Sequence, residues 1–217
     1  TLRRRVISEN MELATIQKVW AAWKLAICNY VNPTSTSAAE LKDLGNHMYD
    51  VFKTTSAGTR SQSEVSAGGT AWECLVCWYL NLCLLGSNTV VIKTKKPNTP
   101  TPISDCITVM YGTTPSGTES DLLAITFPDT VRLKKAYTGS KVGLKRLLDS
   151  ELTHHFSDSS LTVIQCKTNW NDNAQIPMLW DLIYQSKGGF HPATVGHNGF
   201  VNNNLKHFGY AFVTVPT

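Results

Sequence analysis

The spacing of apolar residues divides the chain into an N-terminal helical part and a later part that is richer in strands. Apolar side chains recur at helical spacing over residues 9–31, which predicts a first helix. A second helix is expected over 37–52, with Ser37 as its N-cap and Glu40 completing a capping box. Residues 54–69 are rich in Ser, Thr and Gly, so they are expected to form a loop.

A third helix is expected from about Gly69 to Leu85, and it is apolar on most faces, so it should be buried. Residues 129–160 form a basic insertion that is expected to be partly helical, and 175–187 suit a further helix. Five segments are typical of strands: 89–93, 103–111, 122–127, 161–166 and 207–215. This order predicts a single α/β domain with a mixed central β-sheet of about five strands, flanked by helices.

Length and composition agree with one globular domain. The chain has 217 residues, of which 42% are hydrophobic and 17% are charged, and its net charge is +4. This mild excess of positive charge permits binding to a polyanion without requiring it. We expect residues 1–66 to build a dimer interface or a DNA clamp, and residues 67–217 to form the catalytic core, with the insertion near 129–160.

The apolar run from Ala71 to Leu85 is too short, and with Glu73 and Asn81 too polar, to span a membrane. The pair Cys74-x-x-Cys77 is half of a zinc motif, but no second pair completes it, so core packing is expected there. The use of cysteine fits a reducing compartment rather than a disulfide scaffold. We therefore expect a soluble cytoplasmic protein of the prokaryotic cytosol.

Three segments carry candidate chemistry. Gln165 and Lys167 lie two apart on a strand, so their side chains point to the same side. A lysine is rarely buried without a partner, and Asp121, which opens another strand, could supply the carboxylate. Glu73, near the start of the buried helix, could supply a second carboxylate if that end of the helix packs over the same site.

These residue types suit the hydrolysis of a phosphodiester. The reaction needs a hard cation at the scissile phosphate and a water held in line, and Mg²⁺ usually takes one or two carboxylates with waters and phosphate oxygens. Asp121 would be the carboxylate ligand, Gln165 would offer a neutral carbonyl oxygen, and Glu73 would add a second acid. Lys167 would orient the attacking water and stabilise charge on the phosphate.

The order Asp121, then Gln165-x-Lys167, each at a strand edge, resembles the PD-(D/E)XK nuclease superfamily with Gln in the D/E position. The helix that carries Glu73 resembles the first core helix of that superfamily. The resemblance covers roughly residues 67–186. It implies a mixed sheet of four to five strands flanked by helices and Mg²⁺-dependent cleavage of double-stranded DNA. Size and layout look most like a type II restriction endonuclease, which implies a homodimer on a two-fold symmetric site.

The chain departs from the superfamily pattern in two ways. Ser120 stands where the superfamily has a proline before the aspartate, and 44 positions separate Asp121 from Gln165. The insertion at 129–160 must therefore loop out and return, or the assignment of Asp121 fails. Glu119 is the nearest substitute in that event.

Candidate DNA contacts flank the catalytic segments. Asn side chains can read adenine edges, although they also favour turns. Lysines in the proline-broken loop could meet phosphates, although most such residues are solvated surface. The predicted DNA-binding residues are Lys95, Lys96, Asn169, Trp170, Asn171 and Asn173.

Two other functions remain open at this stage. One is a repair or junction-resolving nuclease that recognises DNA structure rather than sequence. The other is a DNA-binding protein on an inactive nuclease fold, in which the neutral Gln165 marks lost catalysis.

Overall fold

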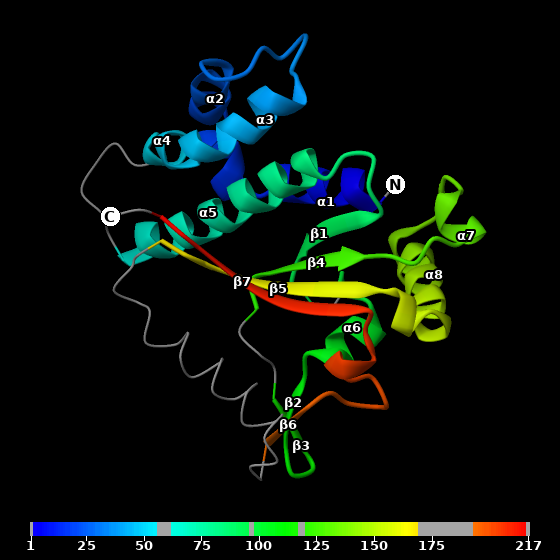
Figure 1. The fold of residues 1–217 in the computed structure, drawn as a ribbon. Helices are drawn as coiled ribbons and strands as arrows, with labels where there is room; N and C mark the ends of the chain where they lie inside the picture. Colours follow the sequence, from blue (N-terminus) through cyan, green and yellow to red (C-terminus); the bar gives the residue numbers. More distant parts are fainter. Residues whose placement is uncertain (1, 56–61, 96–97, 117–119, 169–192, 216–217) are drawn as a thin grey trace.

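A four-stranded mixed sheet forms the centre of the protein, as seen in a computed structural model that describes residues 2–55, 62–95, 98–116, 120–168 and 193–215. The strand order is β1-β4-β5-β7 (Figure 1). β1 pairs with β4 and β4 with β5 in antiparallel fashion, whereas β5 and β7 are parallel. The strands are β1 (Thr89–Lys93), β4 (Leu122–Thr126), β5 (Ser160–Lys167) and β7 (His207–Thr214).

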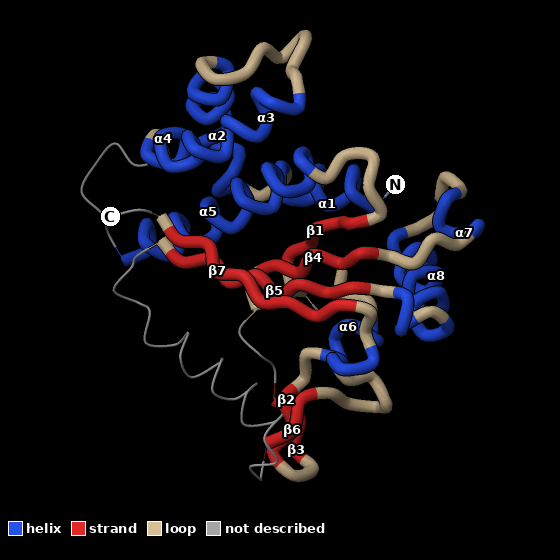
Figure 2. The backbone as a smooth tube through the Cα atoms, in the orientation of Figure 1, coloured by secondary structure: helices blue, strands red, loops and turns tan. Residues whose placement is uncertain are grey.

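Helices cover one face of this sheet in two layers. The long helix α5 (Gln62–Cys83) runs across the sheet, and α1 (Leu2–Met11) lies beside it against β1 (Figure 2). The outer layer packs on α5 and consists of α2 (Ala14–Cys28), α3 (Ala38–Leu44), the 3-10 turn η1 (Gly45–His47) and α4 (Met48–Lys53).

The remaining elements lie beyond the other face and at one end of the sheet (Figure 1). A small sheet of order β3-β2-β6 lies below α6, and α7 and α8 lie at the end of the sheet where β4 finishes. Their bounds are α6 (Thr101–Cys106), β2 (Val109–Tyr111), β3 (Thr114–Ser116), α7 (Val131–Lys134), α8 (Lys141–His154), η2 (Phe156–Asp158), β6 (Ala193–Val195) and η4 (Asn202–Asn204).

A buried asparagine joins α5 to the edge strand β1. Asn81 is fully buried, and its side-chain nitrogen donates to Val91 O at 2.7 Å while its oxygen accepts from Val91 N at 3.1 Å. An edge strand otherwise leaves such backbone groups without partners, which is costly when they are buried. Cys74 and Cys77 are buried beside it in the hydrophobic core, so the core-packing interpretation of this cysteine pair is confirmed.

Several sequence-based expectations are confirmed. The helix near residue 37 begins as predicted, since Ser37 accepts from Glu40 N and the Glu40 carboxylate accepts from Ser37 N. The strands expected at 89–93, 122–127, 161–166 and 207–215 are present within a residue or two of their predicted bounds. The mixed α/β character with flanking helices is also confirmed.

Other expectations were wrong. The single helix over 9–31 is two helices, because the chain turns at Glu12–Leu13 between α1 and α2. Residues 103–106 are helical rather than part of a strand, since Pro100 and Pro102 begin α6 before the short β2. α5 begins at Gln62 instead of Gly69. Within the described ranges the central sheet has four strands, not about five, because β2 joins the small sheet.

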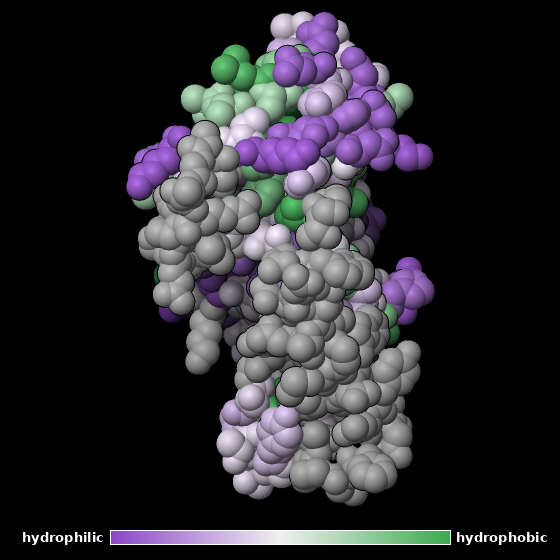
Figure 3. All heavy atoms as spheres, turned by 90° about the vertical axis from the view of Figure 1, so that its left-hand side faces the viewer, coloured by the Kyte–Doolittle hydropathy of each residue, from purple (hydrophilic) through white to green (hydrophobic). Residues whose placement is uncertain are grey.

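The N-terminal helices present a mixed surface. Figure 3 shows apolar side chains gathered at the top of the molecule beside strongly polar ones. Leu25 on α2 is 73% exposed and contributes an apolar side chain to the outer helical layer. The role of residues 1–66 in a dimer interface or DNA clamp stays a prediction.

Candidate active site

The predicted catalytic residues gather at one end of the central sheet. Asp121 directly precedes β4, and its carbonyl oxygen accepts from Thr94 N at 3.0 Å, which prolongs the pairing with β1. Leu122 pairs with Ile164, so the next step of the ladder places Asp121 opposite Gln165. The insertion thus loops out and returns, as the assignment of Asp121 required.

Asp121 is fixed by the backbone of the neighbouring strand. Its Oδ2 accepts a hydrogen bond from Cys166 N at 2.7 Å. Burial raises the pKa of Asp121, the Cys166 N–H partly offsets this, and the charge of Glu73 raises it further. Lys167 and Lys93 act in the opposite direction, and the net result is a pKa above the usual value. These effects require Glu73 and both lysines to lie near the Asp121 carboxylate.

Glu73 forms an ion pair that the sequence did not reveal. Lys93 Nζ lies 2.6 Å from Glu73 Oε2 and 3.7 Å from Cys74 Sγ, and the Lys93 side chain is only 9% exposed. Burial acts to lower the pKa of Lys93, but Cys74 and Glu73 together outweigh it, so the pKa is raised. The ammonium group therefore stays charged against the Glu73 carboxylate.

Lys93 could have been found from the sequence by the same reasoning that drew attention to Lys167. It closes the apolar strand Thr-Val-Val-Ile-Lys, where a buried lysine needs an acid. The sequence also places Lys93 directly before the basic loop that carries Lys95 and Lys96. In the structure that loop begins with the exposed Lys95, whereas Lys93 belongs to the site.

The predicted site residues and Lys93 contribute equal numbers of acidic and basic side chains. Two carboxylates, Glu73 and Asp121, lie with two ammonium groups, Lys93 and Lys167. Gln165 is 2% exposed and adds a neutral amide. No group of three or more His, Cys, Asp or Glu side chains suited to a metal occurs in the part of the chain that is described. Mg²⁺ needs only one or two carboxylates with waters, so the donor set fits that ion and not a zinc site.

Other predicted residues are placed less fully. Lys95 is exposed, as a phosphate contact would require. Glu119, Lys96, Asn169, Trp170, Asn171 and Asn173 lie outside the described residues. The predicted helix over 175–187 also lies outside them.

Fold and site together define a mixed α/β protein with a partly buried cluster of Glu, Asp, Gln and two Lys at one end of its central sheet. Comparisons with protein-family models, with curated proteins and with solved structures found no match. Among the helices of the described residues, none is both long enough and apolar enough to cross a membrane.

Proposed function

We propose that this protein is a Mg²⁺-dependent endonuclease that hydrolyses phosphodiester bonds of double-stranded DNA at a specific short sequence, in the manner of a type II restriction enzyme. The observation that carries the proposal is geometric: Asp121 lies opposite Gln165, two residues before Lys167, and accepts from Cys166 N at 2.7 Å. Lys93, which pairs with Leu122 beside Asp121, brings Glu73 to the same sheet end through a contact of 2.6 Å. A partly buried carboxylate with a raised pKa beside a lysine, as Asp121 is, is typical of catalytic sites.

The sheet supports a restriction-endonuclease-like fold. Three antiparallel strands, β1, β4 and β5, are followed by β7 parallel to β5, and α5 precedes them across one face. This arrangement is a mixed four-stranded sheet with helices on both sides, as the resemblance implies. It brings the ends of β1 and β5 and the start of β4 to one edge, where Lys93, Lys167 and Asp121 lie.

Each side chain has a role in the proposed reaction. Asp121 would bind the metal, with Glu73 as a second acidic ligand and the Gln165 amide oxygen as a neutral one. Bound Mg²⁺ would neutralise the scissile phosphate and lower the pKa of a bound water. Lys167 would hold the attacking water, which would lose a proton to solvent as its oxygen bonds to phosphorus. One phosphorus–oxygen ester bond would break, and the departing oxygen would take a proton from solvent.

Lys93 controls how Glu73 can take part. At 2.6 Å the ammonium group occupies Glu73 Oε2, so Glu73 can reach a metal only through its other oxygen or after this contact loosens. Lys93 thereby positions Glu73 and limits the negative charge available for cations. This balance favours one divalent ion at the site over two.

The remaining parts of the proposal concern partners and place. A two-fold symmetric DNA site would be met by a homodimer, one subunit on each half-site. All six cysteines are free, which agrees with action in the reducing prokaryotic cytosol.

A digest of long unmethylated DNA with Mg²⁺ tests the proposal. We expect discrete, reproducible fragments from the wild type and a loss of about 10²–10³-fold in cleavage rate for Asp121→Asn and for Lys167→Ala. Lys206→Ala, at an exposed lysine directly before β7 and outside residues 1–66, is the matched control and should cut normally.

Each other outcome has a definite meaning. Cleavage confined to branched DNA would favour a junction-resolving nuclease. A wild type that binds DNA but cuts none would favour an inactive DNA-binding protein, and normal cutting by both variants would remove Asp121 and Lys167 from the catalytic assignment.

A further inference from the structure

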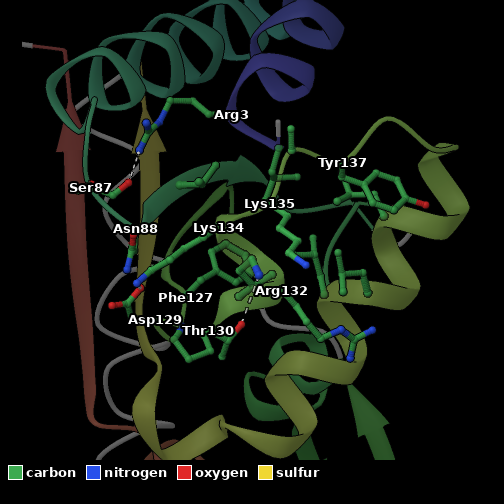
Figure 4. A pocket seen from close by; sticks show the side chains of 18 residues that line it. Arg3, Ser87, Asn88, Phe127, Asp129, Thr130, Arg132, Lys134, Lys135 and Tyr137 are labelled. Carbon is green, nitrogen blue, oxygen red and sulfur yellow. Dashed lines mark hydrogen bonds and ion pairs between the residues drawn. The ribbon is translucent and has the colours of Figure 1, made fainter.

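A hollow lies at the end of the sheet opposite the candidate active site. It has a volume of about 400 Å³ and lies between the end of β4, the segment through α7, the start of α1 and helix α8 (Figure 4). Phe127, which follows β4, lines it, whereas Asp121 precedes β4 at the other end. Six residues of extended chain place the two sites roughly 20 Å apart.

The walls of this hollow carry more positive than negative charge. Arg3, Arg132, Lys134 and Lys135 line it, against a single acid, Asp129. Lys134 pairs with Asp129 at 2.9 Å, and Arg132 pairs with Glu151 behind the wall at 2.8 Å. Neither Arg3 nor Lys135 forms an ion pair with another described residue, and Figure 4 shows Lys135 extending toward the middle of the hollow.

Arg3 adds a positive charge whose hydrogen-bond partners among the described residues are neutral backbone carbonyl groups. Its Nη2 donates to the carbonyl oxygens of Leu84 at 2.6 Å, Ser87 at 3.1 Å and Thr89 at 2.6 Å. Its Nε is buried and has no hydrogen-bond partner among the described residues. Burial lowers the pKa of Arg3, which reflects the cost of holding this charge without an anion. A bound anion would offset that cost.

The floor of the hollow is apolar. Phe127, Leu144 and Leu148 are at most 8% exposed and form part of the core, and Leu133 and the ring of Tyr137 complete the lining. The polar side chains of Asn88 and Thr130 lie at its margin (Figure 4). Inorganic phosphate alone would leave the floor uncovered, whereas a ligand with a flat, largely apolar body and an anionic group would use both surfaces.

We propose that this hollow binds a nucleotide, with its phosphate at Lys135 and its base on the floor formed by Phe127, Leu133 and Tyr137, while Arg3 adds positive charge to the wall. The volume suits a ligand of that size. The nucleotide is either free or the 5′-phosphorylated end of a DNA strand, since both present the same chemistry. The hollow continues outward past Arg146, which leaves room for a chain beyond the first nucleotide.

This site does not depend on the proposed nuclease activity. Binding can be measured by titration calorimetry without divalent metal, so that no cleavage occurs. The probes are deoxyadenosine 5′-monophosphate, inorganic phosphate and a short 5′-phosphorylated single-stranded oligonucleotide.

Two variants test the two surfaces. Lys135 is exposed, so Lys135→Glu should fold normally, and it should weaken nucleotide binding about tenfold or more because a charge-assisted contact becomes a repulsion. Ala136→Trp keeps the charge but fills the hollow, and it should weaken binding to a similar extent. Lys206→Glu makes the same charge change directly before the other edge strand, β7, outside the lining of the hollow, and should leave the affinity within about twofold.

The three probes distinguish a free nucleotide from a 5′-phosphorylated DNA end, and they also show whether the proposal fails. Saturable binding of the mononucleotide that both variants weaken supports a free nucleotide, and binding of the oligonucleotide alone with the same pattern supports a DNA end. Inorganic phosphate binding as tightly as the mononucleotide would overturn the nucleotide assignment. Absence of binding, or equal weakening by Lys206→Glu, would overturn the site.

Discussion

The two ends of the central sheet hold their charges in different ways. At one end Glu73 and Asp121 face Lys93 and Lys167, so the charges balance within a largely buried cluster. At the other end the hollow below α1 and α7 has an excess of cations, and Arg3 is held only by backbone carbonyls.

This difference indicates what each end can accept. A balanced cluster keeps its geometry without a ligand and suits a single divalent cation with its waters. A hollow with an excess of positive charge should be stabilised by a bound anion, because the anion offsets the repulsion and desolvation of the positive side chains in the folded protein. On these two proposals, the same strands, β1 and β4, would connect a cation site at one end to an anion site at the other.

The largest stability effect should come from the balanced end. Glu73→Leu leaves the Lys93 ammonium buried without its carboxylate, and we expect a loss of about 3 kcal/mol in the free energy of unfolding, measured with urea. The double variant Glu73→Leu with Lys93→Met should recover most of that loss, because no charge is then left alone. A single variant as stable as the wild type would show that the cluster is not held by this pair.

A smaller effect is expected at the other end. Arg132 is 63% exposed while its partner Glu151 is 6% exposed, and Glu151 also accepts a hydrogen bond from the Thr130 hydroxyl at 2.6 Å. Arg132→Met should therefore cost about 1–2 kcal/mol, between the values of surface and buried pairs. A loss equal to that of Glu73→Leu in the same urea experiment would remove the contrast between the two ends.

Much of the site could be predicted from the sequence, because strand alternation and chain order are local signals. Gln165 and Lys167 lie on one strand, and Asp121 opens the strand that pairs with it. The need of Lys93 for an acid could be inferred in the same way, but the identity of that acid could not. Its partner Glu73 is 20 positions away on a helix whose packing decides the contact.

The predictions about the fold that were wrong failed for a similar reason. The stretch 103–111 contains several β-branched residues typical of strands, but Pro100 and Pro102 begin a helix over its first part. β2 consequently pairs with β3 and β6 instead of the central sheet. The capping box of Ser37 and Glu40 was predictable because its chemistry lies within four consecutive residues. The hollow beside α7 was not, since its cations come from Arg3 and Lys135, which only the fold brings together.

The smallest effect concerns the pH dependence of stability at Asp121. Burial, together with the nearby Glu73, gives this carboxyl a pKa above the ordinary 3.8. The folded protein thus binds this proton more tightly than the unfolded chain, so its stability falls as pH rises from 3.8 through the raised pKa. Asp121→Asn cannot titrate and keeps an acceptor for Cys166 N, so it should be more stable than the wild type near neutral pH.

The gain should be about 1 kcal/mol or less, because Asp121 is only partly buried and solvent screens its charge. It should shrink as the pH is lowered through the raised pKa of Asp121, because the wild-type carboxyl then also becomes neutral. Thermal unfolding of both proteins across this range measures it, and Asp129→Asn, on the exposed pair with Lys134, is the control with little expected change. A variant less stable than the wild type at neutral pH would mean that Lys93, Lys167 and the Cys166 N–H outweigh burial, and that the charged form of Asp121 is the one the fold stabilises.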